Sequence, residues 1–295
     1  MEKVLVLGKN GQLAREVVKT KPDNIELIAL GSNDLDIRNK KAIGEVFKAY
    51  KPDIVINTAA YTAVDKAESE MTAAYAINEQ GVAFISEASA KHHSRLFHIS
   101  TDFVFDGRKS TPYTYSDKTN PLGVYGASKL AGEKAVCLYN AKNSIIIRTA
   151  WVYSAHGNNF VKTMLRLMQE KPKLGVVYDQ VGSPTWAKGL ATTIWQLIDI
   201  NPEIPEHSPL QLNWTDSGIA SWYDFAVAIQ ELAISKGILS KAVPINAIPS
   251  SSFPTPAKRP SFSVLDKTDL LSILGIESGI HWRTQLSSML DELKD

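Results

Sequence analysis

The chain has 295 residues, of which 44% are hydrophobic and 21% charged, with a mean hydropathy of −0.12. Its net charge of +1 gives no electrostatic reason to expect a nucleic acid or a membrane surface as a partner. No apolar run approaches the roughly 20 residues that span a bilayer, and the first residues lack the pattern of a signal peptide. The single cysteine, Cys137, can form neither an internal disulfide nor a structural zinc site. The composition therefore predicts a cytoplasmic α/β protein.

Short apolar runs alternate with longer helical patterns along the first half of the chain. The apolar runs predict strands at Val4–Leu7, Ile25–Leu30, Ile54–Asn57, Leu96–Ser100 and Ser144–Thr149. The patterns between them predict helices at about Gln12–Thr20, Lys40–Tyr50, Thr72–Lys91 and Val124–Asn140. This alternation predicts βαβ units and a Rossmann-type, doubly wound parallel sheet.

The second half has a different character. Ten of the 14 prolines follow Trp151, and proline interrupts long helices and central strands. We therefore expect a dinucleotide-binding domain at 1–150 and a smaller, loop-rich α/β part at 151–295. We expect this second part to form most of the substrate site and to interleave with the last strands and helices of the first.

A glycine-rich turn joins the first predicted strand to the first predicted helix. Gly8 and Gly11 begin the pattern G-x-x-G-x-x-A. Glycine permits the tight turn and the close approach of a pyrophosphate, while the helix N-terminus offers free N–H groups. An ordinary strand-to-helix turn is the alternative, but the position after the first strand favours a nucleotide site.

The end of the second predicted strand bears on the choice of cofactor. An acidic residue is expected there in a site selective for NAD, but the chain has Gly31-Ser32-Asn33. This absence permits NADPH, although no arginine adjoins the segment to select its phosphate. Asp36, followed by Ile37, either borders the adenine pocket or caps the next helix; the sequence leaves both open.

A tyrosine and a lysine predict the catalytic site. Tyr125 and Lys129 lie four residues apart at the start of a predicted helix and therefore share one face. Tyr125 would be a general acid, with its pKa lowered by the Lys129 ammonium. Thr101 directly follows the fourth predicted strand, where its hydroxyl could bond a carbonyl oxygen; a simple Ser/Thr turn is the alternative. After the third strand, the small residues of Asn57–Thr62 would let the backbone approach a cofactor.

Together these motifs resemble the extended short-chain dehydrogenases/reductases, and more closely the dTDP-4-dehydrorhamnose reductase family. The resemblance covers essentially the whole chain. It rests on Gly8–Leu13, Tyr61–Glu68, Ser100–Gly107, Tyr125-Gly126, Lys129–Glu133, Arg148-Thr149, Trp151–Tyr153, Asn158–Val161, Asp179-Gln180, Gly182–Thr185, Pro254–Ala257 and Arg259-Pro260.

The resemblance implies NAD(P)H-dependent reduction of the C4 ketone of a dTDP-bound 6-deoxy sugar to dTDP-L-rhamnose, for polysaccharide synthesis. Tyr125 would protonate the oxygen, Thr101 would orient it, and Lys129 would tune Tyr125 and hold the nicotinamide ribose. It implies cofactor contacts from Gly8, Gly11, Gln12, Leu13, Asp36, Ile37, Ala60, Tyr61, Thr62, Tyr125 and Lys129. It implies substrate contacts from Thr101, Asp102, Trp151, Asn159 and Arg259.

The resemblance also bears on magnesium and oligomeric state. Some members of the family place three carboxylates around a magnesium ion at a dimer contact. Glu16 and Glu292 match two of them, but Lys188 takes the third place. We therefore expect no metal, and either a monomer or a magnesium-independent homodimer.

Two other functions remain open at this stage. One is a non-catalytic regulatory subunit that binds NADP, although the presence of Thr101, Tyr125 and Lys129 argues against it. The other is a nucleotide-sugar epimerase, which would keep its nicotinamide bound through turnover. The six histidines show no metal-binding spacing, and His98, inside a predicted strand, is expected to be packed.

Overall fold

The computed structural model describes residues 1–294 and is built on a six-stranded sheet in the order β2-β1-β3-β4-β5-β10. Every neighbouring pair in this sheet is parallel, which confirms the predicted doubly wound fold. The strands are β1 (Glu2–Leu7), β2 (Ile25–Leu30), β3 (Ile54–Asn57), β4 (Arg95–Thr101), β5 (Ser144–Thr149) and β10 (Leu210–Asn213). Strand order reverses between β1 and β3, and ligands of such sheets bind outside the carboxyl ends of the strands at this switch point.

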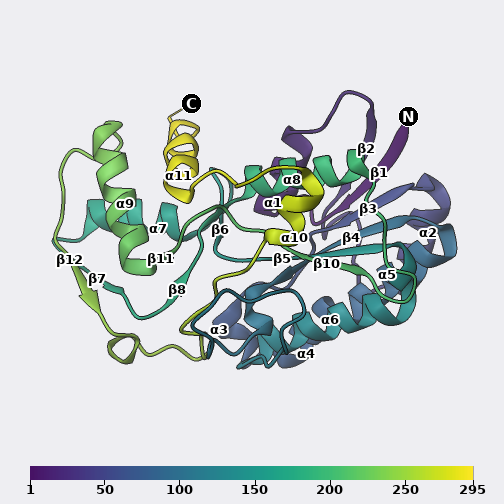
Figure 1. The fold of residues 1–295 in the computed structure, drawn as a ribbon, viewed down its shortest axis with the longest axis horizontal. Helices are drawn as coiled ribbons and strands as arrows, with labels where there is room; N and C mark the ends of the chain where they lie inside the picture. The colour runs from purple at the N-terminus through teal and green to yellow at the C-terminus, as the bar shows by residue number, and fades with distance from the viewer. Residues whose placement is uncertain (295) are drawn as a thin grey trace.

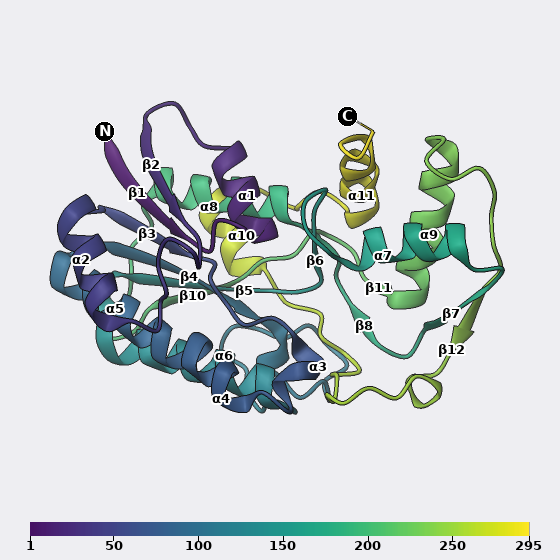
Figure 2. The ribbon, with the colours of Figure 1, turned by 180° about the vertical axis from the view of Figure 1, so that it is seen from behind.

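Helices cover both faces of the sheet (Figures 1 and 2). One face carries α1 (Gln12–Lys19), α8 (Ala187–Ile200) and α10 (Thr268–Leu274). The other carries α2 (Lys40–Tyr50), α5 (Val82–His92) and α6 (Val124–Asn140). The inner strands are mostly apolar because both of their faces are covered; all six residues of β5 are buried.

A smaller part lies beside the sheet, on the left in Figure 1. Its helices are α7 (Phe160–Glu170), α9 (Trp222–Ser235) and α11 (Trp282–Asp291), which share one hydrophobic core. Short strand pairs complete it: β6 (Val152–Tyr153) with β9 (Thr185–Trp186), β7 (Leu174–Val177) with β12 (Ile245–Ile248), and β8 (Val181–Gly182) with β11 (Ala220–Ser221). Although β10 and α8 come from the second half of the sequence, they belong to the central sheet and its cover.

The predicted helix at Thr72–Lys91 is divided. It consists of α4 (Met71–Tyr75), the π-helical turn η1 (Ala76–Gly81) and α5. Within η1, the buried Asn78 side chain accepts from Tyr61 N and donates to Tyr61 O and to Ser128 Oγ. The wide turn thus connects α6 to the segment after β3.

The remaining short elements are α3 (Val64–Ala67), η2 (Asp102–Val104), η3 (Ala141–Asn143) and η4 (Ser250–Ser252). Within residues 1–294, none of the helices has both the length and the apolar character needed to cross a membrane.

Candidate active site

A cleft of about 840 Å³ opens at the carboxyl ends of the strands. It runs from the glycine turn past β4 and α6 to the start of the smaller part. The predicted site residues that line it are Gly8, Gly11, Gln12, Leu13, Asp36, Ile37, Ala60, Thr62, Thr101, Asp102, Tyr125, Lys129 and Trp151. Segments distant in the sequence therefore meet where a doubly wound sheet binds its ligands.

The glycine turn has the geometry needed to hold a diphosphate. Gly8 has φ +93°, and a Cβ there would lie 2.8 Å from Ala59 N, so that only glycine fits without strain. Gly11 is the N-cap of α1 and provides no side-chain cap, which leaves the first N–H groups of the helix available to a ligand. These features fit the pyrophosphate of a nicotinamide dinucleotide.

Two ion pairs neutralise the carboxylates that follow β2. Lys9 Nζ lies 2.6 Å from Asp34, and the Arg38 guanidinium donates to both oxygens of Asp36 at 2.8–3.1 Å. The hydrogen bond from Arg38 lowers the pKa of Asp36. Asn39, not Asp36, caps α2, so the alternative interpretation of Asp36 as that helix's cap is wrong. Arg38 also lines the cleft, and the sequence pattern does not indicate it because it lies five residues beyond Gly31-Ser32-Asn33.

Tyr125, Lys129 and Thr101 converge at the middle of the cleft. Lys129 Nζ donates to Ile99 O at 2.6 Å. Thr101 Oγ1 donates to Asp102 Oδ1 at 3.0 Å and accepts from Phe103 N at 3.2 Å. Thr101 lies at the end of β4, two residues after Ile99. Tyr125 and Lys129 lie one turn apart on the same face of α6. The end of one strand and one face of one helix therefore position all three groups.

The electrostatics of Tyr125 differ from the sequence expectation. Desolvation raises the pKa of its phenol to about 12; a hydrogen bond with Thr101 opposes this rise, and the charge of Asp102 adds to it. Burial lowers the pKa of Lys129 to about 8, against the opposing charge of Glu133. In this structure Tyr125 therefore holds its proton at neutral pH, as a proton donor must.

Two polar atoms in the cleft are buried without a partner. They are Asp102 Oδ2 and Thr149 Oγ1, at the adjacent ends of β4 and β5. Burial raises the pKa of Asp102 to about 6, although bonds from Ser263 and Thr101 favour its ionised form. Unpaired buried groups are costly, and both of these atoms belong to residues that line the cleft.

Trp151 forms the boundary between the cleft and the smaller part. Its backbone is left-handed, with φ +48°, an uncommon conformation for a bulky residue that marks local strain. Its ring stacks on Trp222 with the centroids 3.4 Å apart and the planes 4° apart. The strained backbone and the stacked ring together fix an apolar surface beside Thr101 and Asp102.

Three predicted ligand contacts do not line the cleft. The Tyr61 hydroxyl donates to Glu70 at 2.6 Å, and Arg259 forms an ion pair with Asp65 at 2.8 Å. Asn159 caps α7 and donates to Gln12 Oε1 at 2.8 Å and Ser154 O at 2.7 Å. Each of these side chains is hydrogen-bonded to another group of the protein, and its predicted contact with a ligand stays a prediction.

The residues matching the family's magnesium ligands do not suit a cation. Glu16 is buried and accepts from Ser154 Oγ at 2.6 Å, leaving its other oxygen unpartnered. Glu292 accepts from Lys188 at 2.7 Å and from Lys19 at 2.9 Å. Two ammonium groups adjoin one of the two carboxylates, and residues 1–294 contain no group of three side chains suited to a metal. The arrangement does not fit magnesium.

Comparison with known proteins agrees with this geometry. The sequence profile of the family described as "RmlD substrate binding domain" matches residues 1–295. The chain is 41% identical to the dTDP-4-dehydrorhamnose reductase of Aggregatibacter actinomycetemcomitans over 293 residues, or 98% of each chain.

Solved structures give the same result. The dTDP-4-dehydrorhamnose reductase of Clostridium acetobutylicum has a TM-score of 0.90 and 41% identity, covering 99% of this chain and 100% of that one. The Bacillus anthracis enzyme, solved in complex with NADP, has a TM-score of 0.90 and 33% identity, covering 99% of both chains. The chain therefore belongs to the RmlD substrate-binding-domain family, whose fold it shares.

Proposed function

We propose that the protein reduces the C4 ketone of dTDP-4-dehydro-L-rhamnose with NADPH or NADH, giving dTDP-L-rhamnose. One observation carries this proposal: a single cleft joins the uncapped glycine turn to Tyr125, Lys129 and Thr101. The turn suits a dinucleotide, and the three side chains suit reduction of a carbonyl group. Relatives named dTDP-4-dehydrorhamnose reductase, about 40% identical over nearly the whole chain, support the choice of substrate.

A nicotinamide cofactor bound in the cleft would supply a hydride for C4. Tyr125 gives its phenolic proton to the carbonyl oxygen, so that the ketone becomes an alcohol. Thr101 orients this oxygen, and Lys129 holds the nicotinamide ribose and compensates the phenolate left on Tyr125. Asp102 and Trp151 contact the sugar, because both line the cleft beside Thr101.

The test is an absorbance assay of purified protein with NADPH and dTDP-4-dehydrorhamnose. We expect NADPH to be consumed in proportion to ketosugar, with no consumption when the sugar is omitted. A protein that binds NADPH but never oxidises it would instead be a regulatory subunit. A protein purified with bound nicotinamide, which interconverts nucleotide sugars without net oxidation, would be an epimerase.

We further propose a cytoplasmic enzyme, since it draws on the cell's reduced nicotinamide. It acts as a monomer or as a homodimer that needs no magnesium.

A further inference from the structure

Glu133 is a buried carboxylate next to the proposed site that the mechanism above does not use. It lies on α6 four residues after Lys129, and its side chain is 3% exposed. Oε1 accepts from Ser100 Oγ at 2.5 Å and from Arg148 Nε at 2.9 Å. Oε2 accepts from Arg148 Nη2 at 2.7 Å. Both of its oxygens are therefore held.

The partners of Glu133 are the immediate neighbours of site residues. Ser100 precedes Thr101 on β4, and Arg148 precedes Thr149 on β5. The two strands pair Ser100 with Arg148 and Thr101 with Thr149. One carboxylate on the helix of Tyr125 and Lys129 thus joins both strand ends that form the floor of the cleft.

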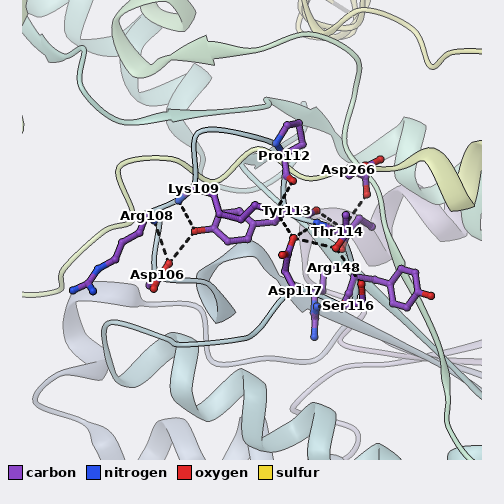
Figure 3. A network of polar contacts seen from close by, with 12 residues as sticks. Asp106, Arg108, Lys109, Pro112, Tyr113, Thr114, Ser116, Asp117, Arg148 and Asp266 are labelled. Carbon is purple, nitrogen blue, oxygen red and sulfur yellow. Dashed lines mark hydrogen bonds and ion pairs between the residues drawn. The ribbon is translucent and has the colours of Figure 1, made fainter.

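Arg148 is fixed from its other side as well. Its other terminal nitrogen, Nη1, donates to the backbone oxygen of Tyr115 at 2.9 Å. Tyr115 lies in the loop between η2 and α6. Figure 3 shows this loop beside Arg148, held by Asp117, which accepts from Lys109 Nζ at 2.6 Å and from Thr114 N at 2.7 Å. The guanidinium has little freedom to move, so it can hold the Glu133 carboxylate in one place.

Glu133 also acts on Lys129 through its charge. Burial lowers the pKa of Lys129 to about 8, and the negative charge of Glu133 opposes this fall. The other titratable group coupled to Lys129 is His98 on β4, whose own pKa is lowered well below its usual value by burial. Around the site, Tyr125 on the same helix and Asp102 on η2 line the cleft, and Arg148 on β5 is paired with Glu133. Among these groups Glu133 is the anion that favours charged Lys129.

We propose that Glu133 is a positioning residue of the ketone-reducing site, which holds Lys129 charged and fixes α6 against the Thr101 end of β4. This inference rests on the proposed function, because it assumes that Lys129 and Thr101 act on cofactor and substrate. It predicts that the charge of Glu133, and not only its shape, affects turnover.

The first test is Glu133→Gln, which keeps the shape of the side chain and removes its charge. We expect kcat to fall by roughly tenfold or more, since small displacements of reacting groups are costly, with a smaller change in KM for the ketosugar. The alkaline limb of the pH profile should move to lower pH, because Lys129 then loses its proton more readily. NADPH affinity, measured by fluorescence in the absence of ketosugar, should weaken as the pH rises. In Glu133→Gln this weakening should begin at a lower pH than in the wild type.

Ser100→Ala is the second test, and it remains informative if Glu133→Gln does not fold. It removes one hydrogen bond and leaves the ion pair intact, so we expect a lower kcat with an unchanged alkaline limb. Glu231→Gln, which breaks an exposed ion pair with Arg283, is the control and should match the wild type.

The outcomes separate this inference from the proposed function. If the wild type oxidises NADPH with ketosugar while Glu133→Gln and Ser100→Ala keep its kcat and pH profile, the positioning role is wrong and the function stands. If the wild type shows no ketosugar-dependent oxidation, the proposed function itself is wrong.

Discussion

Lys188 Nζ lies 2.7 Å from Glu292 Oε1 and joins the first turn of α8 to the residue after α11. Lys19, at the end of α1, reaches the other oxygen at 2.9 Å. Burial opposes ionisation of Glu292, but hydrogen bonds from Lys188 and Lys19 outweigh it and lower its pKa. A lysine pair therefore occupies the place where the family resemblance suggests a cation.

From this arrangement we predict that activity does not require magnesium, because the two ammonium groups supply positive charge and repel a further cation. Turnover and sedimentation should be unchanged by EDTA and by added magnesium. Lys188→Glu provides the matched variant, since it adds a third carboxylate and removes one of the two ammonium groups, so it should bind magnesium more tightly than the wild type by calorimetry. Loss of wild-type activity or dissociation of a dimer on chelation, reversed by magnesium, would contradict the prediction.

Tyr125→Phe should lower kcat by about 10²- to 10⁴-fold, the usual contribution of a general acid. The substitution removes the proton donor alone, so NADPH affinity should change little. Steady-state turnover and a fluorescence titration with NADPH measure the two effects separately. Turnover close to that of the wild type would exclude Tyr125 from the mechanism.

NADPH should be accepted at least as well as NADH, because the segment after β2 presents no unpaired carboxylate to a 2′-phosphate. Ser32→Asp should shift the preference towards NADH by charge repulsion. It is a cleaner test than Gly31→Asp, because a Cβ at position 31 would lie 3.0 Å from Asn10 Nδ2. The measurement is kcat/KM for both cofactors, and a strong wild-type preference for NADH would overturn the prediction.

Asp102→Asn should stabilise the protein at pH 7 while lowering turnover. Burial raises the pKa of Asp102 from 3.8 to about 6, so the folded state binds the proton more tightly than the unfolded state. The wild type therefore loses stability as the pH rises from about 4 to about 6, by at most about 3 kcal/mol at 1.36 kcal/mol per pKa unit. Asp216, whose pKa is also raised by burial, to about 7, titrates in both proteins. Denaturant unfolding between pH 4 and pH 7 should therefore show a steeper loss of stability in the wild type than in the variant, by the amount given for Asp102.

The control for this experiment is Asp199→Asn, which changes an exposed carboxylate on α8. It should leave both the pH dependence of unfolding and the turnover unchanged. If Asp102→Asn unfolds with the same pH dependence as the wild type, Asp102 ionises in the folded protein at no cost in stability, and the prediction is wrong.

The strands could be predicted from sequence where both of their faces are buried. Ile54–Asn57 and Ser144–Thr149 have the predicted bounds, because a continuous apolar run stops where the strand leaves the sheet. Ile25–Leu30, the edge strand, also has its predicted bounds although it is only partly buried. The α6 helix was also predicted with its observed bounds, which placed Tyr125 and Lys129 on one face. Local patterns were sufficient for these features.

Other features depend on contacts between distant residues and could not be predicted in this way. The turn η1 is associated with Asn78, whose partners Tyr61 and Ser128 lie 17 and 50 residues away. Arg259 and Tyr61 matched the family's motifs, but Asp65 and Glu70 hold their side chains. Sequence spacing does not show which of several polar neighbours a side chain will choose.

The joining of β10 to β5 has a consequence for how the chain can fold. The sheet gains its last strand only with Leu210–Asn213, and α8, which packs on α1, comes only after Trp186. While the chain is being synthesised, a nascent chain ending near residue 150 would expose the edge of β5 and the apolar face of α1. The nucleotide half thus cannot complete its folding on the ribosome before much of the other half has emerged, so a gene truncated at that boundary should yield an aggregating fragment rather than an isolated cofactor-binding module.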